Sequence, residues 1–149
     1  MARAYVVTAA SALAAPKTIG AVMGTAATRA ELYDILMSVS TPSDTSLEWI
    51  VQRVTSVASG TNNTAVVPVA LDPGNPAAVA VGVENFTIEP TKTSATEFID
   101  MELNQRASFR WVAAPGRNII APATAQAGIG VICATTGTGT ARATIMFEE

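Results

Sequence analysis

The sequence predicts an all-β protein, a single-domain antiparallel β-sandwich with the strand content of a jelly roll. Short segments of alternating apolar and polar residues recur along the chain, Gly- and Pro-rich turns separate them, and almost no segment has a credible helical pattern. The chain has 149 residues and no linker-like change in composition. We therefore expect residues 1–149 to form one domain.

The N-terminal segment is expected to be less embedded in the sandwich than the rest. Residues 4–8 read as a short edge strand, and an alanine-rich stretch follows them to Pro16. Such a stretch has little apolar surface to bury by itself, so residues 1–16 are predicted to form an extended arm that another subunit orders. The same stretch has a weak signal-peptide character, but Thr8 and Ser11 interrupt its apolar part, which argues against cleavage.

Strands are predicted along the middle of the chain. Residues 29–40 fit both a helix and a strand, and we favour the strand. Residues 46–56 alternate, which directs Leu47, Trp49 and Val51 toward the core. Further strand patterns occupy residues 18–23, 83–88, 97–103, 108–112 and 118–121.

Residues 59–80 form the one long connection of the predicted sandwich. A loop of this length in a compact domain is usually functional or packed on a partner. Its part from Val66 to Leu71 is too apolar to be loosely solvated, and Pro76 is expected to start one helical turn through Val79.

The C-terminal segment, residues 127–147, reads as two strands joined by a tight glycine turn at residues 136–139. This hairpin is expected to hold the C-terminus in a sheet. Its first strand contains Cys133, the single cysteine of the chain. We interpret Cys133 as a buried, inert thiol.

The composition limits the available chemistry. The chain contains no histidine, which removes Ser-His-Asp and Cys-His catalysis and the commonest metal ligand. Acidic groups such as Glu31 with Asp34, or Asp100 with Glu102, are interpreted as solvated charges on a sheet face. We therefore expect no enzymatic activity, no metal and no cofactor.

The charge pattern limits the possible partners. The net charge is -3, and the nine Lys and Arg residues are scattered, so no basic stripe indicates nucleic acid as a partner. No apolar run approaches the ~20 residues of a membrane span. Charged residues make up only 14% of the chain, against about 25% in a typical domain. A surface so poor in charge suits close packing against other protein.

Three segments are candidate protein interfaces: the N-terminal arm, the apolar part of the long connection, and Arg110 with Trp111. Trp and Arg are both enriched at interfaces, although Trp111 also fits a core residue whose neighbouring arginine covers the sheet edge. The candidate interface residues are Tyr5, Val7, Leu13, Val67, Val69, Leu71, Pro73, Arg110 and Trp111.

As a whole, the chain resembles the small jelly-roll decoration (cement) proteins of tailed-bacteriophage heads. The resemblance covers nearly all 149 residues and is carried by the alanine-rich N-terminal segment, the apolar loop at residues 71–78, the strand at residues 109–112 and the ending at residues 144–149. It implies a structural virion protein, assembled in the host cytoplasm, that binds the major capsid protein on the outside of the head. It also implies a homo-oligomer, a dimer or a trimer.

Two other classes of function stay open. A carbohydrate- or receptor-binding module of a phage head or fibre would need exposed aromatic residues along a groove. An enzyme that uses carboxylates alone would need a deep pocket with two facing acids.

Overall fold

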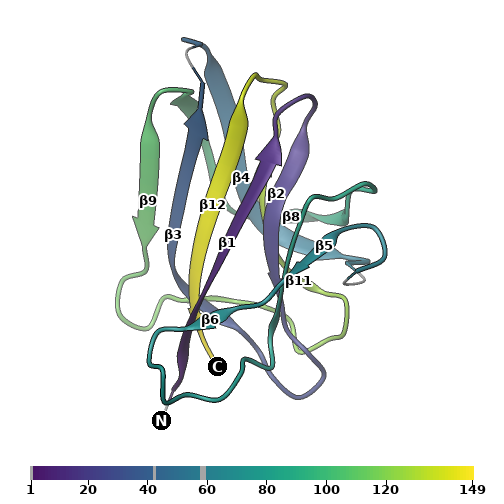
Figure 1. Cartoon of the computed structure of the whole chain (residues 1–149), viewed down its shortest axis with the longest axis vertical. Coiled ribbons are helices and arrows are strands. Elements are labelled where there is room, and N and C mark those ends of the chain that lie inside the picture. Colours follow the sequence, from purple (N-terminus) through teal and green to yellow (C-terminus); the bar gives the residue numbers. More distant parts are fainter. Residues whose placement is uncertain (1, 42, 58–59) are drawn as a thin grey trace.

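The protein is a sandwich of two antiparallel β-sheets (Figure 1). The computed structural model describes residues 2–41, 43–57 and 60–149. These residues form strands, turns and bends and contain no helix, so none of them forms a helical membrane span. The all-β sandwich expected from the sequence is confirmed.

The described residues form six strands in each sheet. Sheet A consists of β1 (Ala4–Ala12), β3 (Glu31–Ser40), β6 (Val69–Ala70), β9 (Ser108–Val112), β10 (Ile119–Ile120) and β12 (Thr140–Glu148). Sheet B consists of β2 (Lys17–Met23), β4 (Ser46–Thr55), β5 (Thr64–Val66), β7 (Val81–Glu84), β8 (Thr91–Asn104) and β11 (Gly128–Cys133). The order is β10-β3-β12-β1-β6 in sheet A, where β9 also pairs with β3, and β5-β7-β2-β11-β4-β8 in sheet B.

The N-terminal segment is a nine-residue strand that pairs with β12 over its whole length and with β6 at Tyr5 and Val6, so the predicted arm is wrong. Strand β1 lies between β12 and β6 in the front layer of Figure 1. Its Ala9 is tightly packed: a Cβ added to Gly20 of sheet B would lie 2.5 Å from the Cβ of Ala9. Small side chains here let the two sheets approach each other closely. At Ala9 the small side chain reflects this close approach and not a lack of packing.

The C-terminal strands do not form the predicted hairpin. Strand β11 pairs with β2 and β4 in sheet B, whereas β12 pairs with β3 and β1 in sheet A. Residues 134–139 therefore cross from one sheet to the other, and Gly139 adopts a φ of 90° in this crossing. Alternation identified both strands correctly, but it does not specify which strands they pair with.

Two hydrophobic clusters hold the sandwich together. The larger cluster lies between the sheets and includes Leu47, Trp49 and Val51, as predicted. The smaller cluster uses the opposite side chains of β2, β4, β7 and β11, and Phe86 and Val57 pack there from outside the strands. Part of the outer face of sheet B is therefore covered by the protein's own connecting segments.

The remaining predictions concern the middle of the chain. The ambiguous segment at residues 29–40 is strand β3, which confirms the choice of a strand. The long connection contains β5 and β6, and no helical turn follows Pro76. Residue 1 of the predicted arm and residue 59 of the predicted connection lie outside the described residues.

Candidate functional site

The structure separates the candidate interface residues into three groups. The first group, from the N-terminal segment, lies in the core. Tyr5, Val7 and Leu13 are each exposed by 1% or less, and the Tyr5 ring stacks on Phe147 with centroids 5.6 Å apart. Their placement on an interface is wrong for the folded protein, because these side chains fill the space between the sheets.

The second group lies on residues 67–80, which we call the strap. The strap runs along the edge of β1 and across the end of the molecule that carries both chain termini (Figure 1). It pairs with β1 through β6, and the N–H of Leu71 donates to the carbonyl of Ala4 at 2.9 Å. The hydroxyl of Tyr5 donates to the carbonyl of Pro76 at 3.0 Å. Strand β1 therefore holds the strap at two points, Leu71 and Pro76, on either side of the turn between them.

The C-terminal residue fixes the last part of the strap. The carboxylate of Glu149 accepts hydrogen bonds from the N–H groups of Val79 and Ala80, each at 2.8 Å. A turn in the middle is closed by Asp72, whose carboxylate accepts from the N–H of Gly74 at 2.8 Å. Such bonds satisfy backbone groups that would otherwise depend on water. The strap is an ordered element without regular secondary structure over most of its length.

The large apolar side chains of the strap point outward although its backbone is fixed, whereas Ala70, Ala78 and Ala80 pack in or against the main core. Val67 is 79% exposed and Val69 is 63% exposed, while Leu71 and Val79 are each half exposed. Pro73 is also exposed. An apolar surface on an ordered backbone loses little conformational entropy when a partner covers it. The strap is therefore the strongest interface candidate of the molecule.

The third group, Arg110 and Trp111, is divided between two faces of β9. Trp111 is half-buried and packs against the main core, whereas Arg110 is on the outer face. Arg110 pairs with Asp34 of β3: its Nε donates to Oδ1 at 3.0 Å, and its Nη2 donates to Oδ2. The hydrogen bond with Asp34, together with the charge of Asp34, raises the pKa of Arg110. Neighbouring residues on a strand face opposite ways, so the two do not form one recognition cluster.

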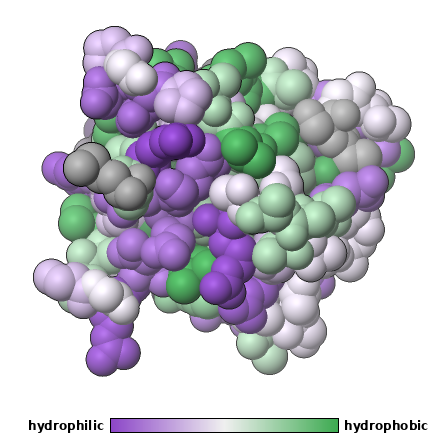
Figure 2. Space-filling model, turned by 90° about the horizontal axis from the view of Figure 1, so that it is seen from below, coloured by the Kyte–Doolittle hydropathy of each residue, from purple (hydrophilic) through white to green (hydrophobic). Residues whose placement is uncertain are grey.

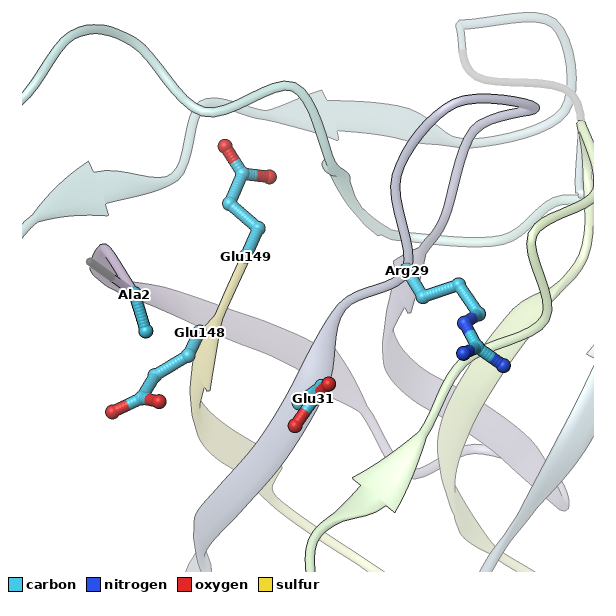
Figure 3. Close-up of a pocket in the computed structure, with 5 residues that line it drawn as sticks. All are labelled: Ala2, Arg29, Glu31, Glu148 and Glu149. Atoms are coloured by element: carbon cyan, nitrogen blue, oxygen red, sulfur yellow. The ribbon is translucent and has the colours of Figure 1, made fainter.

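A shallow acidic pocket lies beside the strap. It is lined by Ala2, Arg29, Glu31, Glu148 and Glu149 (Figure 3). Figure 3 shows Glu149 pointing toward the strap, Glu148 pointing the other way, and Arg29 pointing away from Glu148. Figure 2 looks at this end of the molecule and shows hydrophilic residues gathered over its middle and left, with hydrophobic groups among them.

The described residues offer little catalytic chemistry. They contain no group of three or more His, Cys, Asp or Glu side chains that could hold a metal ion. Cys133 is buried, and burial raises the pKa of its thiol, which keeps the group protonated and unreactive at neutral pH. Among the described residues Asp34 is the one carboxylate that is buried, and it is paired with Arg110.

Several residues of this region were missed by sequence reasoning. The contacts of Glu149 with the strap join residues about 70 positions apart and leave no local signal. Leu36 and Met146 face outward, and the sequence did indicate this. Each is an apolar residue at a position where the alternation of the strand predicts a polar one. A partly apolar outer face of the sheet could have been inferred from these two apolar residues at outward-facing positions.

The comparisons with known proteins do not assign the chain to a family. No protein-family model, no curated protein and no solved structure matches it.

Proposed function

We propose that this protein is a non-enzymatic structural component of a bacteriophage virion. In this proposal it binds the outside of the capsid and stabilises contacts between major capsid proteins. The single observation that carries the proposal is the strap, an ordered backbone that presents Val67, Leu71 and Val79 to solvent. Burying such side chains against a partner is favourable by about 25 cal/mol per Å² of apolar surface.

Two further observations support a binding role. The low share of charged residues, 14%, suits a surface that is largely covered in an assembly. The strap, formed by the long connection, is also part of the resemblance to decoration proteins. A decoration protein acts through many copies, so that modest contacts by each copy add up over the lattice.

The order of the strands supports the jelly-roll part of the proposal. Strands β1, β12, β3 and β9 are neighbours in sheet A, and β2, β11, β4 and β8 are neighbours in sheet B. From β1 to β4 the chain alternates between the two sheets, as does the pair β11 and β12. Such double-sheet folds are common in viral capsid proteins and in lectins.

The carbohydrate-binding alternative has less support. Of the eight aromatic residues (four Phe, two Trp and two Tyr), all of which lie in the described ranges, only Phe98 is exposed. Its ring lies beneath the guanidinium of Arg53, which is 5.3 Å from the ring centroid. A single aromatic residue does not form the stacking row that a sugar-binding groove requires.

The test is binding of the purified protein to phage heads that lack it. Heads of the phage that encodes the chain are mixed with the protein, and bound protein is measured by co-sedimentation and located by cryo-electron microscopy. We expect density on the outer surface, with the strap against the major capsid protein. Protein that stays in the supernatant at every concentration, or binds only inside the head, would contradict the proposal.

A strap variant with a matched control sharpens this test. Val67→Ser with Val79→Ser removes two exposed apolar side chains without touching the core. We expect the double variant to bind heads about tenfold more weakly, because each buried methylene contributes roughly 0.8 kcal/mol. Ile88→Ser, at a similarly exposed apolar residue outside the strap, should bind as the unmodified protein does. Equal loss in both variants would show that the strap has no special role.

A further inference from the structure

Strand β8 leaves one of its two edges open. It is the last strand of sheet B and, within the described residues, pairs only with β4. The ladder is regular from Ser46 opposite Asn104 to Val51 opposite Ile99, and its register shifts lie beyond that stretch. Residues 99–103 therefore form an edge that contains no bulge, no proline and no lysine. Such an edge is a template for pairing with another chain.

The backbone groups on this open edge belong to Asp100 and Glu102. The N–H of Gln105 donates to the carbonyl of Thr45 at 2.9 Å, and the register then directs the backbone groups of residues 103, 101 and 99 toward β4 as well. In an antiparallel ladder the residues between them direct their N–H and C=O groups the other way. The N–H and C=O groups of Asp100 and Glu102 therefore face away from the sheet.

Other parts of the sheet edges are capped, and this one is not. At the end of β8, the carbonyl of Asn104 accepts a hydrogen bond from the N–H of Ala107 at 2.9 Å. Beyond its pairing with β6, the edge of β1 is capped by the carboxylate of Glu84, which accepts from the N–H of Ala10 at 2.7 Å. No described residue caps the open edge of β8 in this way.

The side chains of the same stretch form an apolar row and an acidic row. The apolar row is partly buried and packs against the main core; it consists of Ile99, Met101 and Leu103. Asp100 and Glu102 are exposed on the outer face, where Glu102 lies directly opposite Glu48 of β4. Like charges directly opposite each other destabilise a sheet. Neither Asp100 nor Glu102 forms a salt bridge with another described residue.

We propose that the open edge of β8 binds an extended segment of another protein, which adds a strand to sheet B. The segment alternates apolar residues with lysine or arginine. Its backbone pairs with Asp100 and Glu102, its apolar side chains extend the core beside Met101, and its basic side chains lie against the acidic row. The basic side chains supply the positive charge that the pair of Glu48 and Glu102 lacks. The inference does not rest on capsid binding.

The acidic row argues against a second copy of the chain as the occupant. Two β8 edges would pair antiparallel about a twofold axis, with their outer faces on the same side of the joined sheet. In the register that overlaps the whole open edge, Asp100 of each copy lies opposite Glu102 of the other. Like charges in contact disfavour this pairing and favour a basic partner.

The test is a synthetic peptide, Thr-Val-Lys-Val-Lys-Val-Thr with blocked ends, added to the purified full chain. In the antiparallel register its two lysines lie opposite Glu102 and Asp100, and its middle valine lies opposite Met101. We expect NMR shifts centred on β8 at peptide concentrations up to about 1 mM. The amides of Asp100 and Glu102, which are open in the free protein, should exchange hydrogen more slowly in the complex.

Two control peptides separate strand pairing from general charge attraction. Thr-Val-Glu-Val-Glu-Val-Thr keeps the apolar residues and should bind about tenfold more weakly, because its acids lie against the acidic row. N-methylation of both lysine backbone nitrogens keeps the positive charges but removes the two N–H groups that face β8. This peptide should not bind, since strand addition depends on main-chain hydrogen bonds.

A pair of protein variants reverses the charges. Asp100→Lys with Glu102→Lys should bind the glutamate peptide more tightly than the lysine peptide. Glu31→Lys with Glu148→Lys makes the same change at two acids of sheet A that lie opposite each other. This control should keep the preference for the lysine peptide. Far-ultraviolet circular dichroism confirms that each variant is folded.

Four outcomes would overturn the inference. Three concern the unmodified protein with peptides: no shifts on β8 up to about 1 mM peptide, equal binding of the lysine and glutamate peptides, or undiminished binding of the N-methylated peptide. The fourth is a set of β8 shifts that grow with protein concentration when no peptide is present, because a second copy would then occupy the edge.

Discussion

Asp34 shows how a single charged residue is accommodated within this sandwich. Its side chain is 5% exposed, whereas Arg110 is 61% exposed, so the arginine covers the carboxylate from the solvent side. A buried carboxylate without a partner would be strongly unfavourable. Because the two residues belong to β3 and β9, their pair also attaches an edge strand that has only one neighbour in the sheet. The pair is therefore best explained as structural.

Cys133 should make the folded protein less stable as the pH rises into the alkaline range. Burial raises the pKa of its thiol in the folded state, so the unfolded thiol loses its proton first, near pH ~8.5. Its contribution to the free energy of unfolding is fully present below that pH and is lost as the pH rises toward the folded pKa. Cys133→Ala should therefore lose less stability than wild type between pH 7.5 and about pH 10.

Urea unfolding at the two pH values measures this difference. Tyr33, whose pKa is also raised by burial and by Glu148 and Asp34, is present in both proteins, so the comparison isolates Cys133. An equal decline in wild type and variant would show that the thiol contributes nothing to the pH dependence.

Among the elements, β1 and β2 determine how closely the two sheets approach. An added Cβ at Gly20 would lie 2.5 Å from the Cβ of Ala9, and neither atom belongs to a flexible side chain. Gly20→Ala should lower the free energy of unfolding by about 1–3 kcal/mol through overpacking. Adding Ala9→Gly moves the methyl group to the other sheet and should recover part of this loss. Chemical denaturation checks both variants, and a harmless single substitution would contradict the close approach.

The strap depends on the C-terminal residue for its order. Glu149→Ala removes the acceptor for the N–H groups of Val79 and Ala80, and we expect these two amides to exchange hydrogen much faster. The cost in global stability should be about 1–2 kcal/mol, typical of hydrogen bonds to a charged group at a partly exposed site. Glu149→Gln keeps one strong acceptor and should show a smaller effect. Amide exchange measured by NMR would contradict the assignment if both amides kept their protection.

At the scale of the molecule, the two hydrophobic clusters should unfold together. Both use side chains of β2, β4 and β11, which face the main core and the smaller cluster alternately. Neither cluster can therefore be lost while these strands stay intact. We expect tryptophan fluorescence, from Trp49 and Trp111, and far-ultraviolet circular dichroism to report the same unfolding midpoint. Phe86→Ala should lower both midpoints equally, and two separate transitions would contradict a single cooperative unit.

The proposed interface is also a property of the whole molecule. The strap is held in place by residues near both ends of the chain, namely Ala4, Tyr5 and Glu149. The apolar character of residues 66–71 could be seen in the sequence. Its exposure on a fixed backbone could not, because exposure depends on contacts with Ala4, Tyr5 and Glu149.

The sequence by itself determined most of the strands and the fold class. The alternation of Leu47, Trp49 and Val51 is a local property, and it places their side chains on one face of any strand. Tertiary structure alone decided the partners of each strand. Strands β11 and β12 lie in different sheets, and the alanine-rich β1 is paired with β12 along its whole length, because pairing and burial depend on residues far away in the chain. Alanine is too small to indicate its own neighbours, and only the facing Gly20 explains why Ala9 is buried.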